Sequence, residues 1–176
     1  LKLKMKKVKQ KIRYFIFPLM AFMSLSSFFV PAESIQIRLF AHLKINELHT
    51  IVNLGTYKLM GDGELVMDCR PLMDFRMNAK GDSIELSHNQ TVLGVYKYIK
   101  FVSDSGCELK LKLSNPDRKI RTYQDDLSFS MSDGFIRIIN EVVLDNYIAG
   151  VTEAEAGSRS TVEFYKVQSI LARTFA

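Results

Sequence analysis

Apolar and polar side chains alternate over most of residues 35–143, and this spacing constrains the fold more than any other feature of the chain. The first run places one set of side chains on a common face, with Phe40 as an exception on the other: Ile35, Ile37, Leu39, Ala41, Leu43 and Ile45. A period of two is typical of a half-buried β-strand. We therefore expect residues 35–143 to be built mainly of strands.

The same alternation recurs in shorter runs that turn residues separate. The expected strands cover residues 57–59, 65–69, 84–86, 95–101 and 107–113, and the expected turns lie at residues 61–63, 80–82, 88–89, 105–106 and 115–116. A hairpin is predicted between residues 127–131 and 135–143, because Asp133 and Gly134 can supply the positive φ angles of a tight turn. Since the connections are short, we expect antiparallel pairs.

The period changes after Leu144, where helical spacing begins. Asp145 is expected to N-cap a short helix, and a polar segment is expected from Thr152 to Ser160. Ser160 and Glu163 then fit a capping box for a longer helix. Its apolar stripe comprises Val162, Phe164, Val167, Ile170, Leu171 and Phe175. The predicted fold class is α+β, with an antiparallel β-rich region followed by a short helix and a longer C-terminal helix.

The apolar stripe continues to Ala176 with no glycine or other C-cap after it. A stripe of this width needs apolar partners to pack against. We expect an incomplete domain whose remaining part supplies those partners.

The N-terminal residues have the three parts of a secretory signal. Residues 1–13 hold seven cationic side chains and no acidic one, residues 14–30 are apolar or small, and small residues precede Glu33. A spanning helix needs about 20 apolar residues, and this shorter run contains Pro18. A cleaved signal peptide over residues 1–32 is the preferred interpretation, and a retained membrane anchor is the alternative.

The net charge of the chain, +5, comes from this leader. Residues 33–176 carry 17 basic and 19 acidic side chains, a net charge of −2. A nucleic-acid partner is therefore not expected, since it would require a basic surface. The 144 residues that remain suffice for one domain, or for a small domain and part of another.

Two cysteines, Cys69 and Cys107, fall in phase with inward-facing strand positions. Buried free thiols and a disulfide are both compatible with this pattern in an exported protein. A metal site is not expected here, because two isolated cysteines without a nearby histidine lack ligand spacing. His42, His49 and His88 are scattered, and we expect them to be surface or strand residues.

Residues 140–176 resemble the SpoIID/LytB family of stage II sporulation protein D and the amidase enhancer LytB. The family pattern is a strand, then L-[ED]-x-Y-[LI]-x-G-V, then a glutamate, then a helix with K-x-Q-x-x-x-A-R-[TS]-[YF]-A. The matching residues here are Tyr147, Gly150, Val151, Glu155, Lys166, Gln168, Ala172, Arg173, Thr174, Phe175 and Ala176. Residues 123–127 resemble the family's Y-R-G-x-[LI] strand, with two changes. The resemblance divides the chain into a signal peptide (1–32), a β-rich region (33–122) and the start of a SpoIID/LytB-like domain (123–176).

The resemblance implies an exported or envelope-associated protein that acts on peptidoglycan glycan strands. In active relatives the glutamate at the position of Glu155 is the catalytic acid of a lytic transglycosylase, and Tyr147, Lys166, Gln168 and Arg173 are expected to bind substrate. The family usually follows this glutamate with Met-Pro, whereas Ala156 and Gly157 follow it here, which puts the activity in doubt more than the family. No cofactor is expected in this segment, and some relatives carry zinc in the later part of the domain.

Single-carboxyl chemistry at Glu155 would require a raised pKa and hence a partly apolar pocket. A glutamate in a polar segment is more often simply solvated, and Glu153 is expected to face away into water. Two alternatives therefore stay open. One is a non-catalytic wall-binding partner that enhances a cell-wall amidase, and the other is an exported β-rich adhesion module whose local match is accidental.

Overall fold

The computed structural model describes residues 33–104, 106–157 and 159–176. Residues 33–176 form one compact unit of twelve strands and two helices. The predicted signal peptide or anchor lies outside the described residues. Neither α2 (Leu144–Ala156) nor α3 (Val162–Phe175) has the length and apolar content that a membrane-spanning helix requires.

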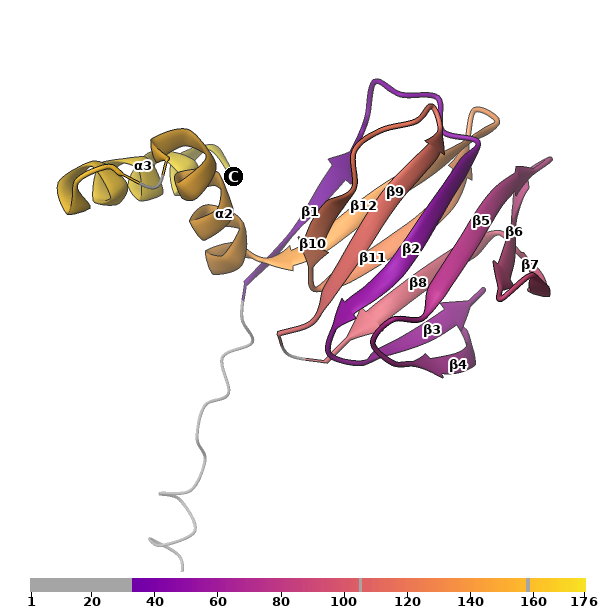
Figure 1. Cartoon of the computed structure of the whole chain (residues 1–176). Helices are drawn as coiled ribbons and strands as arrows, with labels where there is room; N and C mark the ends of the chain where they lie inside the picture. The colour runs from indigo at the N-terminus through magenta and orange to yellow at the C-terminus, as the bar shows by residue number, and fades with distance from the viewer. Residues whose placement is uncertain (1–32, 105, 158) are drawn as a thin grey trace, which may run out of the picture. The chain divides into compact units, whose positions relative to one another are not determined.

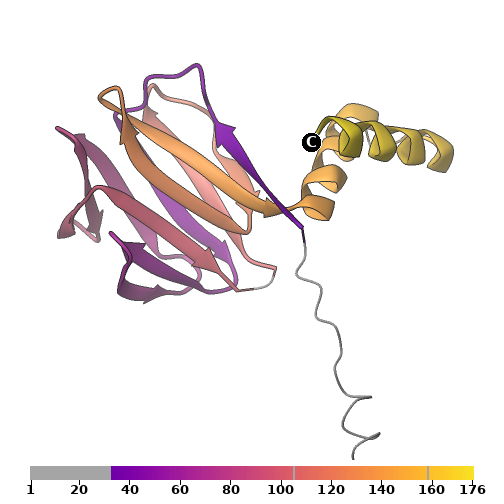
Figure 2. The same ribbon diagram turned by 180° about the vertical axis from the view of Figure 1, so that it is seen from behind.

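Twelve strands form two six-stranded sheets in which every pair is antiparallel, as predicted (Figure 1). Sheet A has the order β1 (Ser34–Leu39), β12 (Phe135–Val143), β11 (Asp126–Ser132), β8 (Tyr98–Ser103), β3 (Tyr57–Gly61), β4 (Glu64–Cys69). Sheet B has the order β10 (Arg121–Gln124), β9 (Glu108–Asn115), β2 (Glu47–Leu54), β5 (Asp74–Lys80), β6 (Ser83–His88), β7 (Thr91–Tyr96). Figure 2 shows sheet A from its outer side, with β1 beside the β11–β12 hairpin.

The two sheets bury one apolar core between them. Phe101 of β8 is fully buried and meets Phe75 of β5 across the sandwich, with ring centroids 5.4 Å apart. Tyr57 and Phe129 pack edge-on against the same Phe101 ring at 6.3 and 6.0 Å. Burying large apolar side chains on one face of each sheet stabilises such a sandwich. The predicted α+β class, with a β-rich region before two helices, is confirmed.

The predicted β11–β12 hairpin is confirmed. Ser132 pairs with Phe135, and the two turn residues between them, Asp133 and Gly134, have φ angles of 55° and 78°. Two positive φ angles in a row are typical of the type I′ turn, whose twist matches that of the flanking strands.

The first expected strand, residues 35–45, is wrong in its second half. β1 ends at Leu39 because Phe40 adopts a positive φ of 52°, and the Leu43 amide then donates to the Phe40 carbonyl over 2.8 Å. Ile45 is still buried, at 1% exposure, but after the turn.

The single strand predicted over residues 95–101 is two strands in different sheets. β7 ends at Tyr96 in sheet B and β8 begins at Tyr98 in sheet A. Asp62 holds this crossing, because its Oδ1 accepts from the Lys97 and Tyr98 amides at 2.9 and 2.8 Å. The alternation of side chains continues through the crossing and conceals it.

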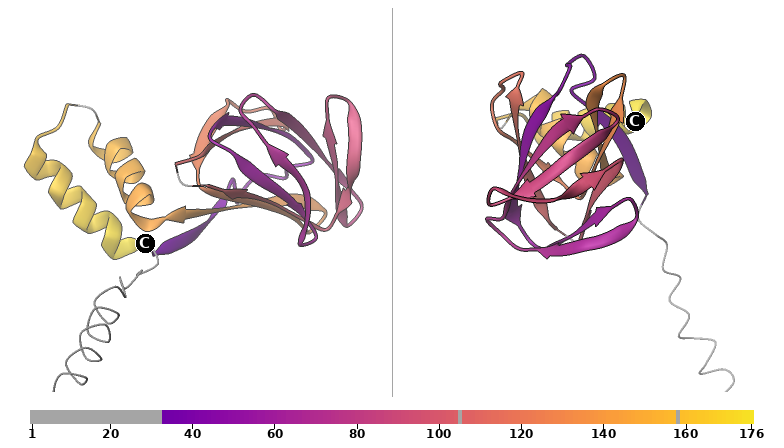
Figure 3. Two further views of the ribbon diagram at one scale, coloured as in Figure 1. Left: turned by 90° about the horizontal axis from the view of Figure 1, so that it is seen from below. Right: turned by 90° about the vertical axis from the view of Figure 1, so that its right-hand side faces the viewer.

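Helices α2 (Leu144–Ala156) and α3 (Val162–Phe175) lie side by side as a hairpin (Figure 3). The predicted Asp145 cap is wrong: Val143 is the N-cap residue of α2, and Asp145 lies in its first turn. The polar segment predicted from Thr152 is also wrong, because α2 continues to Ala156, with Thr152 buried and Glu153 and Glu155 exposed. The N-cap of α3 is Thr161, one residue later than predicted; its hydroxyl accepts from the Phe164 amide at 3.3 Å, and because Phe164 has no polar group to return the bond, the predicted capping box is wrong.

Both cysteines are buried and free. Cys69 ends β4 and Cys107 precedes β9, and their exposed fractions are 0% and 1%. Burial raises the pKa of the Cys69 thiol to about 12. Their inward orientation confirms the interpretation of the strand phase.

The domain boundary predicted after residue 122 stays a prediction. Strands from both sides of it share sheet A, because β11 pairs with β8 and β12 pairs with β1.

Candidate functional site

A groove of about 760 Å³ lies between α2 and the neighbouring edges of the sandwich. Its position follows from the chain itself, because β12 runs directly into α2 without a connecting loop. The sandwich contributes side chains from β1, β10 and β12, and α2 contributes the opposite wall. The residues used below are Arg121, Tyr123, Gln124, Asn140, Tyr147, Gly150, Val151 and Glu153.

Asp125 fixes the start of α2 against the sandwich. Its Oδ2 accepts from the Val143 amide at 3.0 Å and from Asn146 Nδ2 at 3.2 Å. Amides at the N-terminus of a helix lack partners within the helix, and a carboxylate there also interacts favourably with the helix dipole. Asp125 thus performs the capping role that the sequence assigned to Asp145.

Asn140 ties β12 to the β10–β11 corner at the floor of the groove. It is only 5% exposed, and its Nδ2 donates to the carbonyls of Gln124 and Asp126 at 2.8 and 3.0 Å. A buried amide with both hydrogen bonds made resists displacement. The groove floor is therefore held by side chains as well as by the β-ladder.

The β10 wall combines aromatic and cationic groups. Phe40 packs edge-on against Tyr123 at 6.3 Å, and the Arg121 guanidinium lies 5.7 Å from the Phe40 ring centroid. Burial raises the pKa of Tyr123, and Arg121 offsets part of that rise, so this phenol stays neutral at ordinary pH. Rings with nearby hydrogen-bonding groups can hold a ligand that has both apolar and hydroxylated faces.

The structure places one predicted substrate-binding residue in this groove, Tyr147, which is half-buried on α2. The other three lie on α3, outside the groove lining. Lys166 is exposed, Gln168 is half-buried, and Arg173 reaches back to Asp145 with Nη2 3.3 Å from Oδ1. Their predicted roles stay predictions.

Glu155 and Glu153 differ in their position relative to the groove and not in burial. Glu155 lies in the last turn of α2 and is exposed, and it is not among the groove residues. Glu153, expected to face away, is also exposed but lines the groove. The catalytic role of Glu155 stays a prediction.

Sequence reasoning missed Arg121 and Gln124 as groove residues, because the four residues of β10 have no alternation that marks a strand. Tyr123 was noticed as part of the resemblance but not as part of a site. The tyrosine that begins the Y-R-G-x-[LI]-like segment was the available signal, since β10 lies directly before the corner that binds α2.

The apolar side of α3 is uncovered in the described part of the chain. The helix packs against α2 through half-buried residues such as Ser169, whose hydroxyl lies 3.3 Å from that of Thr152. On the other side Val167 is 54% and Phe175 85% exposed.

Within the described ranges no group of three or more His, Cys, Asp or Glu side chains is arranged to hold a metal ion. The zinc expected for the later part of the domain in some relatives concerns residues beyond this segment and stays a prediction.

Comparison with protein families finds a match for the segment that contains α2. Residues 132–176 match the family model SpoIID, described as stage II sporulation protein, and this is about a quarter of the chain. No curated protein matches the chain, and no solved structure does. The matched segment contains the β11–β12 turn, β12, α2 and α3, and with them Tyr147, Gly150 and Val151 of the groove. Residues 132–176 are thus similar to the SpoIID family, which is consistent with the SpoIID/LytB resemblance and relates the chain to sporulation and the cell wall.

Proposed function

We propose that this protein is exported and binds peptidoglycan glycan strands in the groove beside α2. One observation carries the proposal: the helix that bears the family motif forms a wall of a groove of about 760 Å³, and Tyr147 of that motif lines it opposite Arg121 and Tyr123. Pockets for small ligands usually measure about 300–1,000 Å³ and combine aromatic surface with a few polar groups. A short stretch of glycan strand has the matching chemistry, since each sugar has apolar C–H faces and a rim of hydroxyl groups.

The catalytic form of the proposal is lytic transglycosylation with Glu155 as acid and then base. The carboxylic acid would protonate the glycosidic oxygen as the C1–O bond breaks. The resulting carboxylate would remove the proton of the 6-hydroxyl of the same sugar, whose oxygen closes on C1 as a 1,6-anhydro ring. Every atom then comes from the glycan, so the step needs neither a water nucleophile nor a cofactor.

The position of Glu155 bears on this catalytic form. A general acid that works near neutral pH needs shelter from water to stay protonated, and Glu155 is exposed among the described residues. In this proposal the bound glycan itself would have to supply the shelter.

The second candidate is a non-catalytic wall-binding partner that enhances a cell-wall amidase. Two placements favour it: Glu155 is exposed, and the groove forms without it. Such a partner would need the groove residues and would not need Glu155.

Glycan strands lacking stem peptides separate the two candidates. The full-length protein would be incubated with such strands, and the 1,6-anhydro ends counted by mass spectrometry. New ends that disappear in Glu155→Gln and persist in the matched variant Glu153→Gln support catalysis. If no new 1,6-anhydro ends form, or if Glu155→Gln forms as many as the wild type, the catalytic form of the proposal is refuted.

An amidase assay then tests the partner role. Stimulation of a cell-wall amidase that survives Glu155→Gln but is lost in Tyr147→Ala supports the enhancer. If neither the wild type nor Glu155→Gln stimulates the amidase, the enhancer role is refuted.

Export is a separate part of the proposal. N-terminal sequencing of the protein recovered from the cell envelope should begin near Glu33 if residues 1–32 are a cleaved signal. A chain that retains residues 1–32 in the membrane fraction would indicate the anchor, and a chain found only in the cytoplasm would refute export.

A further inference from the structure

The outer face of sheet B carries a second pocket, of about 430 Å³, that shares no residue with the groove beside α2. Strands β2, β5 and β6 form its floor, and the β6–β7 turn forms one side. We call it the sheet-B pocket; it is lined by His49, Asp74, Arg76, Asn78, Glu85, Ser87, Asn89, Gln90 and Val92. Neither the family match, which begins at residue 132, nor the proposed function gives this face a role.

The strand register arranges these polar side chains in two parallel rows. One row runs across the three strands as Glu47, Asn78 and Glu85, because Asn78 pairs with both glutamates. The next row is His49, Arg76 and Ser87. Directly opposite residues in antiparallel strands hold their side chains close together on one face. The result is a mixed array of hydrogen-bond donors and acceptors on one face of the sheet.

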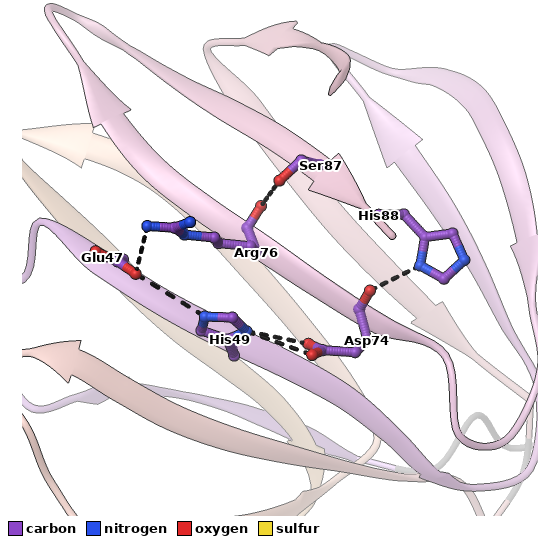
Figure 4. Close-up of polar contacts among 6 residues, drawn as sticks. All are labelled: Glu47, His49, Asp74, Arg76, Ser87 and His88. Carbon is purple, nitrogen blue, oxygen red and sulfur yellow. Dashed lines mark hydrogen bonds and ion pairs between the residues drawn. The ribbon is translucent and has the colours of Figure 1, made fainter. Parts of the chain in front are cut away.

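Ion pairs hold the charged side chains of this face in place (Figure 4). Arg76 Nη2 lies 2.9 Å from Glu47 Oε1, and His49 Nδ1 lies 3.3 Å from Asp74 Oδ1. His49 Nε2 is also 3.9 Å from the same Glu47 oxygen, so the imidazole sits between two carboxylates. Side chains that already hold one another lose less entropy when a ligand binds them.

The inner-facing side chains at the middle of β5 and β6 are buried in the core, which makes the floor rigid. Phe75 and Met77 of β5 and Leu86 of β6 are each 0% exposed. The buried residues alternate with the pocket residues along each strand, so a shift of the pocket floor would disturb the core. A site on rigid strands holds its geometry better than one on loops.

The β6–β7 turn adds two amide side chains to one side of the pocket. Asn89 and Gln90 have φ angles of 48° and 67°, although neither is glycine. Since His88 pairs with Thr91, these residues form a two-residue hairpin turn of the same kind as Asp133 and Gly134. Both side chains line the pocket.

The composition of the pocket excludes several ligand classes. Arg76 is paired with Glu47, and Lys80 Nζ is paired with Glu85 at 2.7 Å, so no unpaired cation is left in these rows to attract a phosphate or a polyanion. Val92 is the sole aliphatic residue among the pocket's lining, which disfavours a lipid tail or an apolar peptide. Ligand hydroxyl groups both donate and accept, and they match a mixed array of carboxylates, amides and a guanidinium.

We propose that the sheet-B pocket binds a neutral saccharide. The proposal goes beyond the function of the α2 groove and stands whether or not that groove binds glycan.

The test is titration of the full chain with four neutral tetrasaccharides, namely chitotetraose, cellotetraose, maltotetraose and laminaritetraose, with dextran sulfate as the polyanion. Binding is measured by calorimetry and located by amide chemical shifts. At least one tetrasaccharide should bind saturably and shift residues of β2, β5 and β6. Arg76→Ala and Asn78→Ala should each weaken that binding about tenfold or more.

Arg137→Ala is the matched control, because Arg137 is an exposed arginine of sheet A whose Nε donates to Ser130 Oγ at 3.2 Å. It should leave the affinity unchanged, and the unfolding midpoints of all variants show whether they are folded. Asn78→Ala decides the outcome if Arg76→Ala proves unstable.

Three results would overturn the proposal: no saturable binding of any tetrasaccharide, binding that survives both sheet-B variants, or binding of dextran sulfate alone. Loss of binding in Tyr147→Ala with full binding in Arg76→Ala would place the sugar in the α2 groove. That result would refute this second site and leave the proposed function intact.

Discussion

Asp125 holds α2 against the sandwich while adopting a φ angle of 63°. In the resemblance of residues 123–127 to the Y-R-G-x-[LI] pattern, Asp125 stands where the pattern has glycine, a residue that accepts a positive φ without cost. Here aspartate accepts the left-handed backbone and contributes two hydrogen bonds to the start of α2. Substitutions at this residue can therefore separate the backbone effect from the capping effect.

Asp125→Ala removes both hydrogen bonds and places a Cβ-bearing residue without local hydrogen bonding at positive φ. Hydrogen bonds to a charged acceptor contribute about 1.5–3 kcal/mol, and left-handed backbone costs an ordinary residue about 1–2 kcal/mol. Since Asp125 is half-exposed, we expect a loss of about 2–4 kcal/mol in the free energy of unfolding. Asp125→Gly should lose less, because glycine accepts the φ angle, and Asp125→Asn should lose at most about 1 kcal/mol.

Urea unfolding measures these differences. With a denaturant slope of about 2 kcal/mol per molar, a loss of about 3 kcal/mol lowers the midpoint by about 1.5 M. Hydrogen exchange should show faster opening of the first turn of α2 in Asp125→Ala. An alanine variant with the midpoint of the wild type, or a glycine variant less stable than the alanine variant, would refute the reasoning.

Three further predictions concern the sandwich. Phe101→Ala should lower the free energy of unfolding by about 3–5 kcal/mol in urea titrations, because it opens a cavity among three aromatic neighbours. The control Leu72→Ala, at an 87% exposed side chain, should change it by less than about 0.5 kcal/mol, and equal effects of the two variants would contradict the assigned core. Tyr57→Phe should leave stability unchanged or raise it by about 1 kcal/mol in thermal unfolding, because the buried Tyr57 hydroxyl has no hydrogen-bond partner within the described ranges; a large loss would reveal a partner. The Cys69 thiol should resist a disulfide reagent at about pH 8 and react once urea unfolds the chain, and rapid modification of the native protein would contradict its burial. Because the folded state keeps this thiol protonated, stability should fall as the pH rises from about 9 to about 12, and Cys69→Ala should lose less over that range.

The sequence predicts the β-rich class, the β11–β12 hairpin and both helices, because each depends on local spacing or on turn residues. It did not reveal β2, although β2 lies inside sheet B. The outer face of β2 carries Ile51 while a fully buried Thr50 faces the core, so the contrast between the two faces is weak. The missed β5 was recoverable, since Phe75 and Met77 alternate with Arg76 and Asn78.

The site was predictable where it depends on α2 and hidden where it depends on strands distant in sequence. Tyr147 was found because it belongs to a motif. Arg121 was not, because only the register of β10 with β9 brings it to the groove. The sequence did not predict that Glu153 lines the groove, because α2 is one turn longer than the polar composition of its end indicated.

Binding of the full chain to purified peptidoglycan sacculi tests the central claim most directly. The measurement is co-sedimentation in the Arg76→Ala background, so that the sheet-B pocket does not contribute. We predict saturable binding that Tyr147→Ala weakens about tenfold or more, equivalent to about 1.4 kcal/mol, and that Arg137→Ala leaves unchanged. A chain that stays in the supernatant, or a Tyr147→Ala variant that sediments like its parent, would contradict the claim that the α2 groove binds the glycan strands of the wall.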